Sequence, residues 1–142
     1  MQIFITGTPF DTARDLDPRR LNKQIIETDQ IIKAITGFGK WFNHPIVKMY
    51  KNHVNFLMLY LCCLEAYKNG DIVKALQFSD AAMNNKPDFI DENLITQMKR
   101  RLYTKDNNYY SQWKDLGTSD INFYYVDGNW LYYQNGKLIK TI

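Results

Sequence analysis

Four polar side chains near the N-terminus have types and spacing that could do chemistry. They are Arg20, Lys23, Gln24 and Glu27. On a helix they fall within a sector of roughly 100°, at the edge of a stripe of apolar residues rather than opposite it. Two cations and a carboxylate held at the edge of a core could bind an anion and move protons at a bound substrate.

The position of the two arginines favours a functional interpretation of this cluster. Arg19 and Arg20 follow Asp17-Pro18, which is typical of a helix start. Cations are unfavourable in a first helical turn, where the helix dipole is already positive. An anion docking there would explain them. The alternative is a solvated helix face with ordinary pairs such as Lys23–Glu27.

A second cluster is Trp41-Phe42-Asn43-His44-Pro45. Asn43 suits an N-cap and Pro45 suits a first helical turn. A histidine at a helix N-terminus has its positive form disfavoured, so we expect His44 to be a neutral donor or acceptor near pH 7. A purely structural role for His44 is the alternative. The second histidine, His53, has no companions at metal-ligand spacing, and we expect neither a metal nor a cofactor.

A third cluster combines cations with aromatic residues. Lys99, Arg100, Arg101 and Lys105 precede the aromatic segment 109–113. This mixture suits backbone and stacking contacts to nucleic acid. The alternative is a helix end whose cations complement the dipole. If both basic clusters bind DNA, they should lie on the same side of the molecule.

Composition indicates a globular protein of 142 residues, the size of one domain. Hydrophobic residues make up 45% and charged residues 23%, which argues against disorder. The net charge of +3 is only mildly basic and does not by itself indicate nucleic acid. Ten tyrosines suit a core but also stacking on bases.

Several features indicate a location inside the cell. Cys62 and Cys63 are adjacent in an apolar helical run, so we expect reduced core thiols. Residues 1–6 do not resemble a signal peptide, and no apolar stretch reaches the ~18 residues of a membrane span. We therefore expect a cytoplasmic protein that does not bind membranes.

The periodicity predicts a mostly α fold, a compact bundle of about four helices after a short strand, or an extended segment, at residues 2–6. The first helix should bury Leu21, Ile25, Thr28, Ile32 and Ile35. The helix that follows residues 43–45 is apolar nearly all round in its middle, which marks it as the most buried. The four predicted helices span residues 18–35, 45–68, 72–84 and 91–103.

The C-terminal part has a different pattern. Three short aromatic and aliphatic runs are separated by Asp127-Gly128 and Asn135-Gly136, which are strong hairpin signals. We expect a three-stranded antiparallel meander over residues 121–141, packed against a helical core of residues 17–116. No linker separates the two, so the prediction is a single domain, 1–142.

Parts of the chain resemble the pyrimidine-dimer DNA glycosylase family of phages and bacteria, the endonuclease V type of UV-repair enzyme. One matching segment runs from Ala13 to Gln24 and continues with Glu27 and Gln30. Another is Asn43-His44-Pro45 with Met49. A weaker third match covers residues 102–110, which include Tyr109-Tyr110.

The resemblance implies excision of damaged pyrimidines, such as UV photoproducts, from duplex DNA. An amine attacks the sugar C1′ and forms a Schiff base, a carboxylate handles protons, and elimination then nicks the strand. A nucleotide is extruded from the stack. The implied partner is duplex DNA in a bacterial or phage-infected cell, and we expect a monomer.

The resemblance also assigns roles to residues. Arg19, Arg20 and Lys23 match positions that hold phosphates, Glu27 is the acid, and Asn43 and His44 match a second polar pair. Independently of the resemblance, the mixture of cations and aromatic residues predicts DNA contacts by Lys99, Arg100, Arg101 and Lys105.

The chain departs from the family pattern at the nucleophile. The usual nucleophile is the α-amine of a small second residue, but here the second residue is Gln2, which is too large for the usual Met removal. The candidates are therefore the amine of Met1 and the side chain of Lys23. The family acid also normally follows an Arg directly, whereas Leu21 follows Arg20 and Glu27 lies about two turns further along.

Other classes of function stay open at this point. One is a DNA-binding module without catalysis, and another is an enzyme that acts on a modified nucleotide. A third is a structural helical protein whose basic clusters are only solvated.

Overall fold

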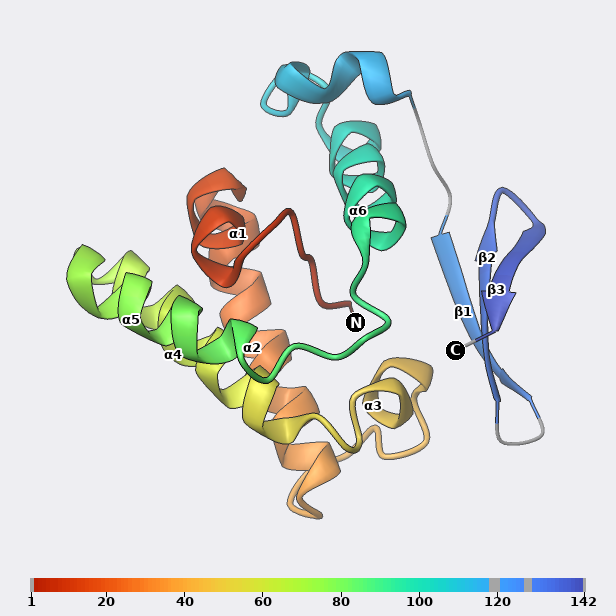
Figure 1. Ribbon diagram of the computed structural model, residues 1–142, viewed down its shortest axis with the longest axis horizontal. Coiled ribbons are helices and arrows are strands. Elements are labelled where there is room, and N and C mark those ends of the chain that lie inside the picture. The colour runs from red at the N-terminus through yellow and green to blue at the C-terminus, as the bar shows by residue number, and fades with distance from the viewer. Residues whose placement is uncertain (1, 118–120, 127–128, 142) are drawn as a thin grey trace. The chain divides into compact units, whose positions relative to one another are not determined.

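The computed structural model describes residues 2–117, 121–126 and 129–141. The chain divides into two compact units, residues 1–88 and residues 89–142 (Figure 1). The fold is mostly helical with an antiparallel sheet at the C-terminus, as the sequence predicts. The single domain stays a prediction, and each unit is described by itself below.

The first unit contains five helices within its described residues, more than the sequence predicts. One unpredicted helix, α1, begins with a capping box in which Thr8 and Asp11 bond each other's backbone N–H groups. The helices are α1 (Pro9–Asp15), α2 (Pro18–Ile35), α3 (Pro45–Met49), α4 (Val54–Lys68) and α5 (Ile72–Met83).

The α2 helix begins and ends where the sequence predicts, with Asp17 as N-cap and Thr36 as C-cap. Its buried face differs from the prediction, because Ile25, Ile32 and Ile35 are only partly buried. The face is rotated by about one residue, since polar side chains on it bond the N-terminal segment. The fully buried positions are Leu21, Gln24, Thr28, Ile31 and Ala34.

The predicted strand at residues 2–6 is wrong, because this segment is extended but has no strand partner in the described chain. Side chains of the helices bond its backbone instead. Tyr60 Oη donates to Phe4 O at 2.7 Å, and Thr6 N donates to Thr12 Oγ1 at 3.0 Å. The apolar residues Ile3 and Ile5 are buried beneath it.

The predicted helix 45–68 is broken into α3 and α4 by a turn at residues 50–53. His53 N donates to Tyr50 O at 2.8 Å in this turn. The buried Tyr50 ring stacks on Phe56 at 6.4 Å between centroids, which turns the chain into α4. The N-cap of α3 is His44 rather than Asn43.

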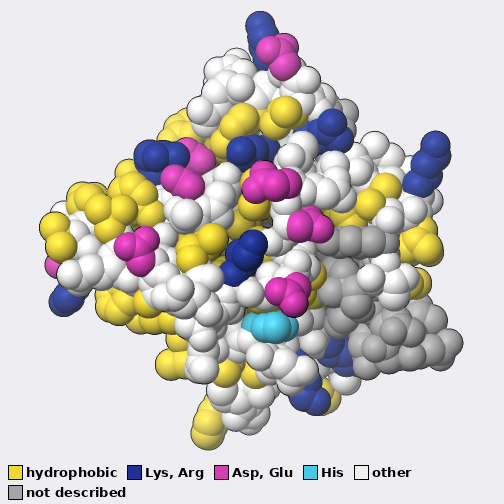
Figure 2. All heavy atoms as spheres, in the orientation of Figure 1, with side chains coloured by type: hydrophobic (Ala, Val, Ile, Leu, Met, Phe, Trp, Pro, Cys, Tyr) yellow, Lys and Arg dark blue, Asp and Glu magenta, His cyan; other side chains and the backbone are white. Residues whose placement is uncertain are grey.

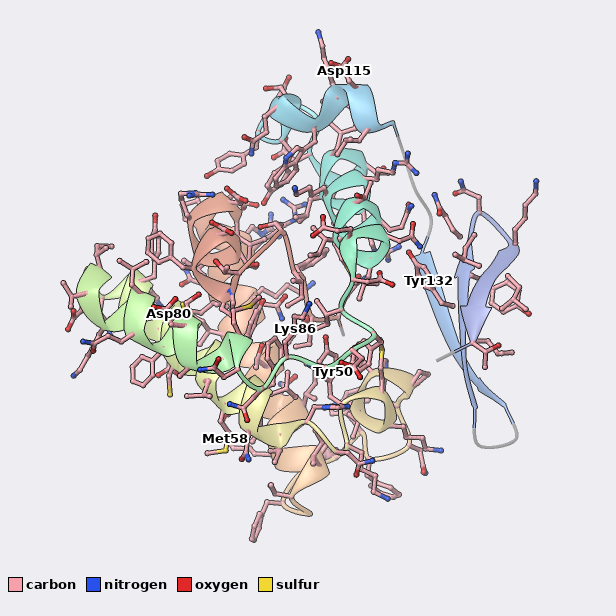
Figure 3. The ribbon with its side chains drawn as sticks, viewed as in Figure 1. Tyr50, Met58, Asp80, Lys86, Asp115 and Tyr132 are labelled. Atoms are coloured by element: carbon pink, nitrogen blue, oxygen red, sulfur yellow. The ribbon has the colours of Figure 1, made fainter. Side chains whose placement is uncertain are left out.

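The core of the first unit lies where α4 meets α2, α1 and α5. Leu57, Tyr60 and Leu64 on α4 are fully buried, as expected for the most apolar helix. Met58 on the opposite face of α4 points outward (Figure 3). Apolar side chains also reach the surface over α4 and α5 (Figure 2).

The second unit contains α6 (Glu92–Lys105), a 3-10 helix η1 (Ser111–Leu116) and strands β1 (Ile121–Val126), β2 (Asn129–Gln134) and β3 (Lys137–Thr141). The strands pair antiparallel in the order β1-β2-β3, with an irregularity between Tyr132 and Tyr133. The turn at Asn135-Gly136 is confirmed, with both residues at positive φ. The predicted turn at 127–128 lies outside the described residues.

With α1, α3 and η1 added, the prediction of about four helices is wrong. The described residues form six α-helices and one 3-10 helix. The additional helices are short, at five to seven residues, and such lengths give little periodicity to recognise.

Candidate active site

The Gln24 side chain on α2 holds the N-terminal segment in place. Its Oε1 accepts a hydrogen bond from Phe4 N at 2.9 Å, and its Nε2 donates to Gln2 O at 2.8 Å. This pair of bonds replaces the pairing that a neighbouring strand would give. Gln24 is buried and also bonds Thr28, so its orientation is fixed by its surroundings.

Glu27 lies one turn further along α2 and contacts the same segment. Gln2 N donates to Glu27 Oε2 at 3.4 Å, and Lys23 Nζ lies 3.8 Å from Glu27 Oε1. The Glu27 side chain is 18% exposed and that of Lys23 is 71% exposed. Glu27 is therefore partly desolvated and paired with one cation, and its role in catalysis stays a prediction.

The contact with Gln2 brings the start of the chain close to this carboxylate. Met1 itself lies outside the described residues.

The charges of the N-terminus and of Glu27 both affect the pKa of His44. Burial lowers its pKa, the positive N-terminus lowers it further, and Glu27 acts in the opposite direction. The ring nitrogen Nδ1 accepts a hydrogen bond from Ile46 N at 3.1 Å, as the N-cap of α3. The proton of the neutral ring therefore resides on Nε2, and His44 presents an N–H donor, as the sequence predicts.

The arginines at the start of α2 are not equivalent. Arg20 Nη1 lies 3.1 Å from Asp17 Oδ1, the N-cap carboxylate, and the side chain is only 25% exposed. This ion pair offsets the unfavourable position of a cation in the first turn of α2. Stability therefore explains part of the presence of Arg20 there, and a bound anion is not required to explain it. Arg19 is exposed and Asn43 is exposed as well.

Two residues near this cluster have a place that sequence reasoning did not find. Gln24 was grouped with the polar edge of α2 but is buried and positions the N-terminus. Trp41 belongs to the second predicted cluster, but no local pattern indicates its place edge-on to His44, with ring centroids 6.4 Å apart. A glutamine at a spacing that fits the buried stripe is the signal that could have indicated the first.

The basic cluster on α6 is engaged partly within its own unit. Arg100 Nη1 donates to Gln97 Oε1 at 3.3 Å, and Lys99 Nζ lies 5.9 Å from the centroid of the Trp113 ring. Trp113 stacks on Tyr110 at 5.4 Å. Arg101 is half-buried and Lys105 is exposed. Because α2 and α6 belong to different units, a shared DNA-binding face stays a prediction.

In the second unit, the charge of Arg100 on α6 affects the pKa of Tyr132 on β2. This ring is buried on β2, on the side that faces α6 (Figure 3). Burial and Asp91 raise the pKa of Tyr132, and Arg100 acts in the opposite direction. Tyr132 is therefore a neutral, buried packing residue.

Thiol chemistry does not fit the described residues. Burial raises the pKa of Cys63 to about 12 and also raises that of Cys62, so little of either thiol is ionised near pH 7. Within residues 2–117, 121–126 and 129–141, no three His, Cys, Asp or Glu side chains are placed to hold a metal ion. The helices in that same part of the chain are too short or too polar to cross a membrane.

Comparison with known proteins adds one match. Residues 1–66 match the family described as pyrimidine dimer DNA glycosylase. No curated protein and no solved structure matches the chain. The matched range contains the N-terminal segment, Gln24, Glu27 and His44, but not α6 or the sheet, so the third resembling segment, 102–110, lies outside it. The resemblance is thereby confirmed for residues 1–66, which are similar to a family of DNA-repair glycosylases.

Proposed function

We propose that this protein is a DNA glycosylase that excises damaged pyrimidines from duplex DNA. The observation that supports the proposal is the contact of Gln2 N, in the residue that follows Met1, with the partly buried carboxylate of Glu27 at 3.4 Å. An amine beside a carboxylate is the pair that displacement at a sugar C1′ requires. The family match over the same residues supports this chemistry.

In this proposal the α-amine of Met1 is the nucleophile. An α-amino group is less basic than a lysine side chain, so more of it is unprotonated near neutral pH. Its neighbours are also fixed, since Gln24 and Glu27 bond the segment that carries it. Lys23 is the second candidate, and its largely exposed ammonium group is less constrained.

Glu27 and His44 would assist the displacement. The amine nitrogen bonds to C1′, while the glycosidic bond breaks and its electron pair leaves with the base, which takes up a proton. Glu27 can accept the proton that the amine loses and can stabilise positive charge at C1′. The N–H of neutral His44 can donate a hydrogen bond to an oxygen of the sugar or of the leaving base.

The lyase step is part of the same proposal. The bond between amine and C1′ leads to a Schiff base once the sugar ring opens, and loss of a proton from C2′ then expels the 3′ phosphate. Arg19, Arg20 and Lys23 would contact phosphates beside the lesion, and Asn43, which forms the second polar pair with His44, would also contact the DNA. The α6 cations Lys99, Arg100, Arg101 and Lys105 would add contacts elsewhere on the duplex.

The test is strand cleavage of UV-irradiated duplex by the protein and by Glu27→Gln, beside a gel-shift on the same samples. We expect Glu27→Gln to lose excision by a factor of about 10² or more and to bind DNA within about twofold of the unchanged protein. Full activity in Glu27→Gln would remove Glu27 from the mechanism. Binding without cleavage by the unchanged protein would favour a DNA-binding module.

A further inference from the structure

The loop between α2 and α3 exposes three large aromatic side chains within five residues. Phe38 is 87% exposed, Trp41 56% and Phe42 65%. Single exposed aromatic residues are common, but three within five residues are unusual, and a concentration of exposed apolar side chains indicates a binding surface. We call these residues the aromatic loop.

The aromatic loop lies in a stretch of chain that has only positive formal charge. Residues 30–64 contain Lys33, Lys40, Lys48 and Lys51 and no Asp or Glu. Lys33 pairs with Asp29 on α2 at 2.8 Å, while Lys40 and Lys51 are exposed. Exposed aromatic rings among lysines suit a polyanion that offers flat apolar surfaces, and nucleic acid is such a partner.

The backbone of the aromatic loop is held in a defined shape. Trp41 adopts a left-handed conformation with φ 70°, which is uncommon for a bulky residue, and His44 N donates to Trp41 O at 2.8 Å. At the other end, a Cβ on Gly39 would come within 2.8 Å of Ala34 N, so only glycine permits this approach to α2. The rings are therefore presented from a shaped loop that is anchored at both ends.

The aromatic loop adjoins the site already described. The Trp41 ring lies edge-on to His44 at 6.4 Å, and His44 senses the charges of Glu27 and the N-terminus. A duplex whose sugar reaches Glu27 would thus bring its neighbouring base steps to the aromatic loop. Extruding a nucleotide leaves a gap in the stack, and inserted apolar side chains can fill such gaps.

We infer that Phe38, Trp41 and Phe42 form a wedge that enters the duplex beside the lesion and stacks on the base exposed by extrusion. This inference rests on the proposed function, because it takes damaged duplex DNA as the partner. Phe42 and Trp41, the nearest in sequence to His44, would make the principal contacts, and Lys40 would contact a flanking phosphate.

The test uses a duplex with a tetrahydrofuran abasic analogue and 2-aminopurine as the neighbouring base. Its affinity is measured for the unchanged protein, Phe42→Ala, Trp41→Ala and the control Val73→Ala, which removes a side chain of similar exposure, 67%, from α5. We expect each loop variant to bind the duplex about tenfold more weakly than the unchanged protein. We also expect each loop variant to lose the change in 2-aminopurine fluorescence that binding of the unchanged protein causes. Val73→Ala should behave as the unchanged protein, and circular dichroism checks that every variant is folded.

Cleavage of irradiated duplex, measured in parallel, separates the two ideas. Cleavage by the unchanged protein with normal binding by both loop variants overturns the wedge alone. Binding that depends on the loop without any cleavage supports the wedge and overturns the glycosylase. Binding to vesicles of anionic lipid that Phe42→Ala abolishes, with DNA binding unchanged, overturns the wedge in favour of a membrane surface. Absence of DNA binding by the unchanged protein overturns both.

Discussion

The N-terminal segment and the C-terminal sheet are both extended, but their backbones find different partners. In the sheet, backbone pairs with backbone along whole strands, with Phe123 opposite Tyr132 in the register of β1 and β2. In the N-terminal segment, side chains provide the partners, and Gln24 alone bonds both Gln2 and Phe4. One region repeats a single interaction many times, and the other depends on a few individual side chains.

The difference shows how the candidate site is assembled. A strand partner would fix the N-terminal segment against another extended segment of the chain. Gln24 instead fixes it against α2, and Glu27 follows one turn later on the same helix. The position of the N-terminus and the position of the carboxylate are therefore set by one helix. It follows that single substitutions should affect the N-terminal segment far more than the sheet.

The largest of these effects is expected for Gln24→Ala. The change leaves Phe4 N and Gln2 O without their partner, and a buried unpaired group costs about 1–3 kcal/mol. Displacement of the N-terminus by about 1 Å should reduce strand cleavage roughly 10²-fold. Urea unfolding and cleavage of irradiated duplex measure the two effects. A stable Gln24→Ala protein with full cleavage would contradict the positioning role.

A smaller effect is expected for Tyr60→Phe. This change removes the hydroxyl that donates to Phe4 O at 2.7 Å and leaves the ring in the core. We expect a loss of about 1 kcal/mol in the free energy of unfolding and a modest loss of cleavage. Denaturant unfolding gives the first value. A loss of cleavage as large as that of Gln24→Ala would show that the segment is held chiefly from the α4 side.

A still smaller effect is the dependence of stability on pH that comes from His44. Because its pKa is lower in the folded protein than in the unfolded chain, the unfolded chain takes up the proton first as the pH falls. The free energy of unfolding should therefore decrease as the pH drops below about 6.5. His53 shifts in the same direction and contributes too.

The variant His44→Asn isolates this contribution, because asparagine can cap α3 but does not titrate. Stability measured between pH 7 and pH 5 should decrease less steeply in His44→Asn than in the unchanged protein. Equal slopes in the two proteins would show that His44 is not disfavoured as a cation in the folded state.

The smallest effect is expected in the sheet, for Leu138→Ala. Leu138 on β3 is exposed, and its backbone pairing with Tyr133 does not depend on the side chain. We expect a change in stability within about 0.5 kcal/mol and unchanged cleavage. A larger loss of cleavage would show that the sheet takes part in the reaction.

The parts of the fold that local rules determine could be predicted from the sequence. Asp17-Pro18 and Thr36 bound α2 as expected, and Asn135-Gly136 forms the expected turn. The error at residues 2–6 has a physical reason. An apolar run shows that a segment is buried, but it does not show whether its backbone pairs with a strand or with side chains such as Gln24.

The candidate site could be predicted by residue type but not by contact. The chemistry of their side chains and the resemblance to a known family indicate Glu27 and His44 as candidate site residues. The contact of Gln2 with Glu27 joins residues that are 25 positions apart, and no local pattern indicates it. The N-cap of α3 is His44 rather than the predicted Asn43. This position goes with the turn in which His44 N donates to Trp41 O, and local sequence rules do not indicate that turn.

The central claim is that the N-terminal amine, beside Glu27, attacks the sugar. The most direct measurement is borohydride trapping on damaged duplex, followed by mass spectrometry of the peptide that carries the adduct. Lys23→Arg, which keeps the charge but removes the alternative primary amine, serves as the matched variant. We predict an adduct on Met1 in both proteins and its loss after N-terminal acetylation. An adduct on Lys23 that disappears in Lys23→Arg would contradict the account.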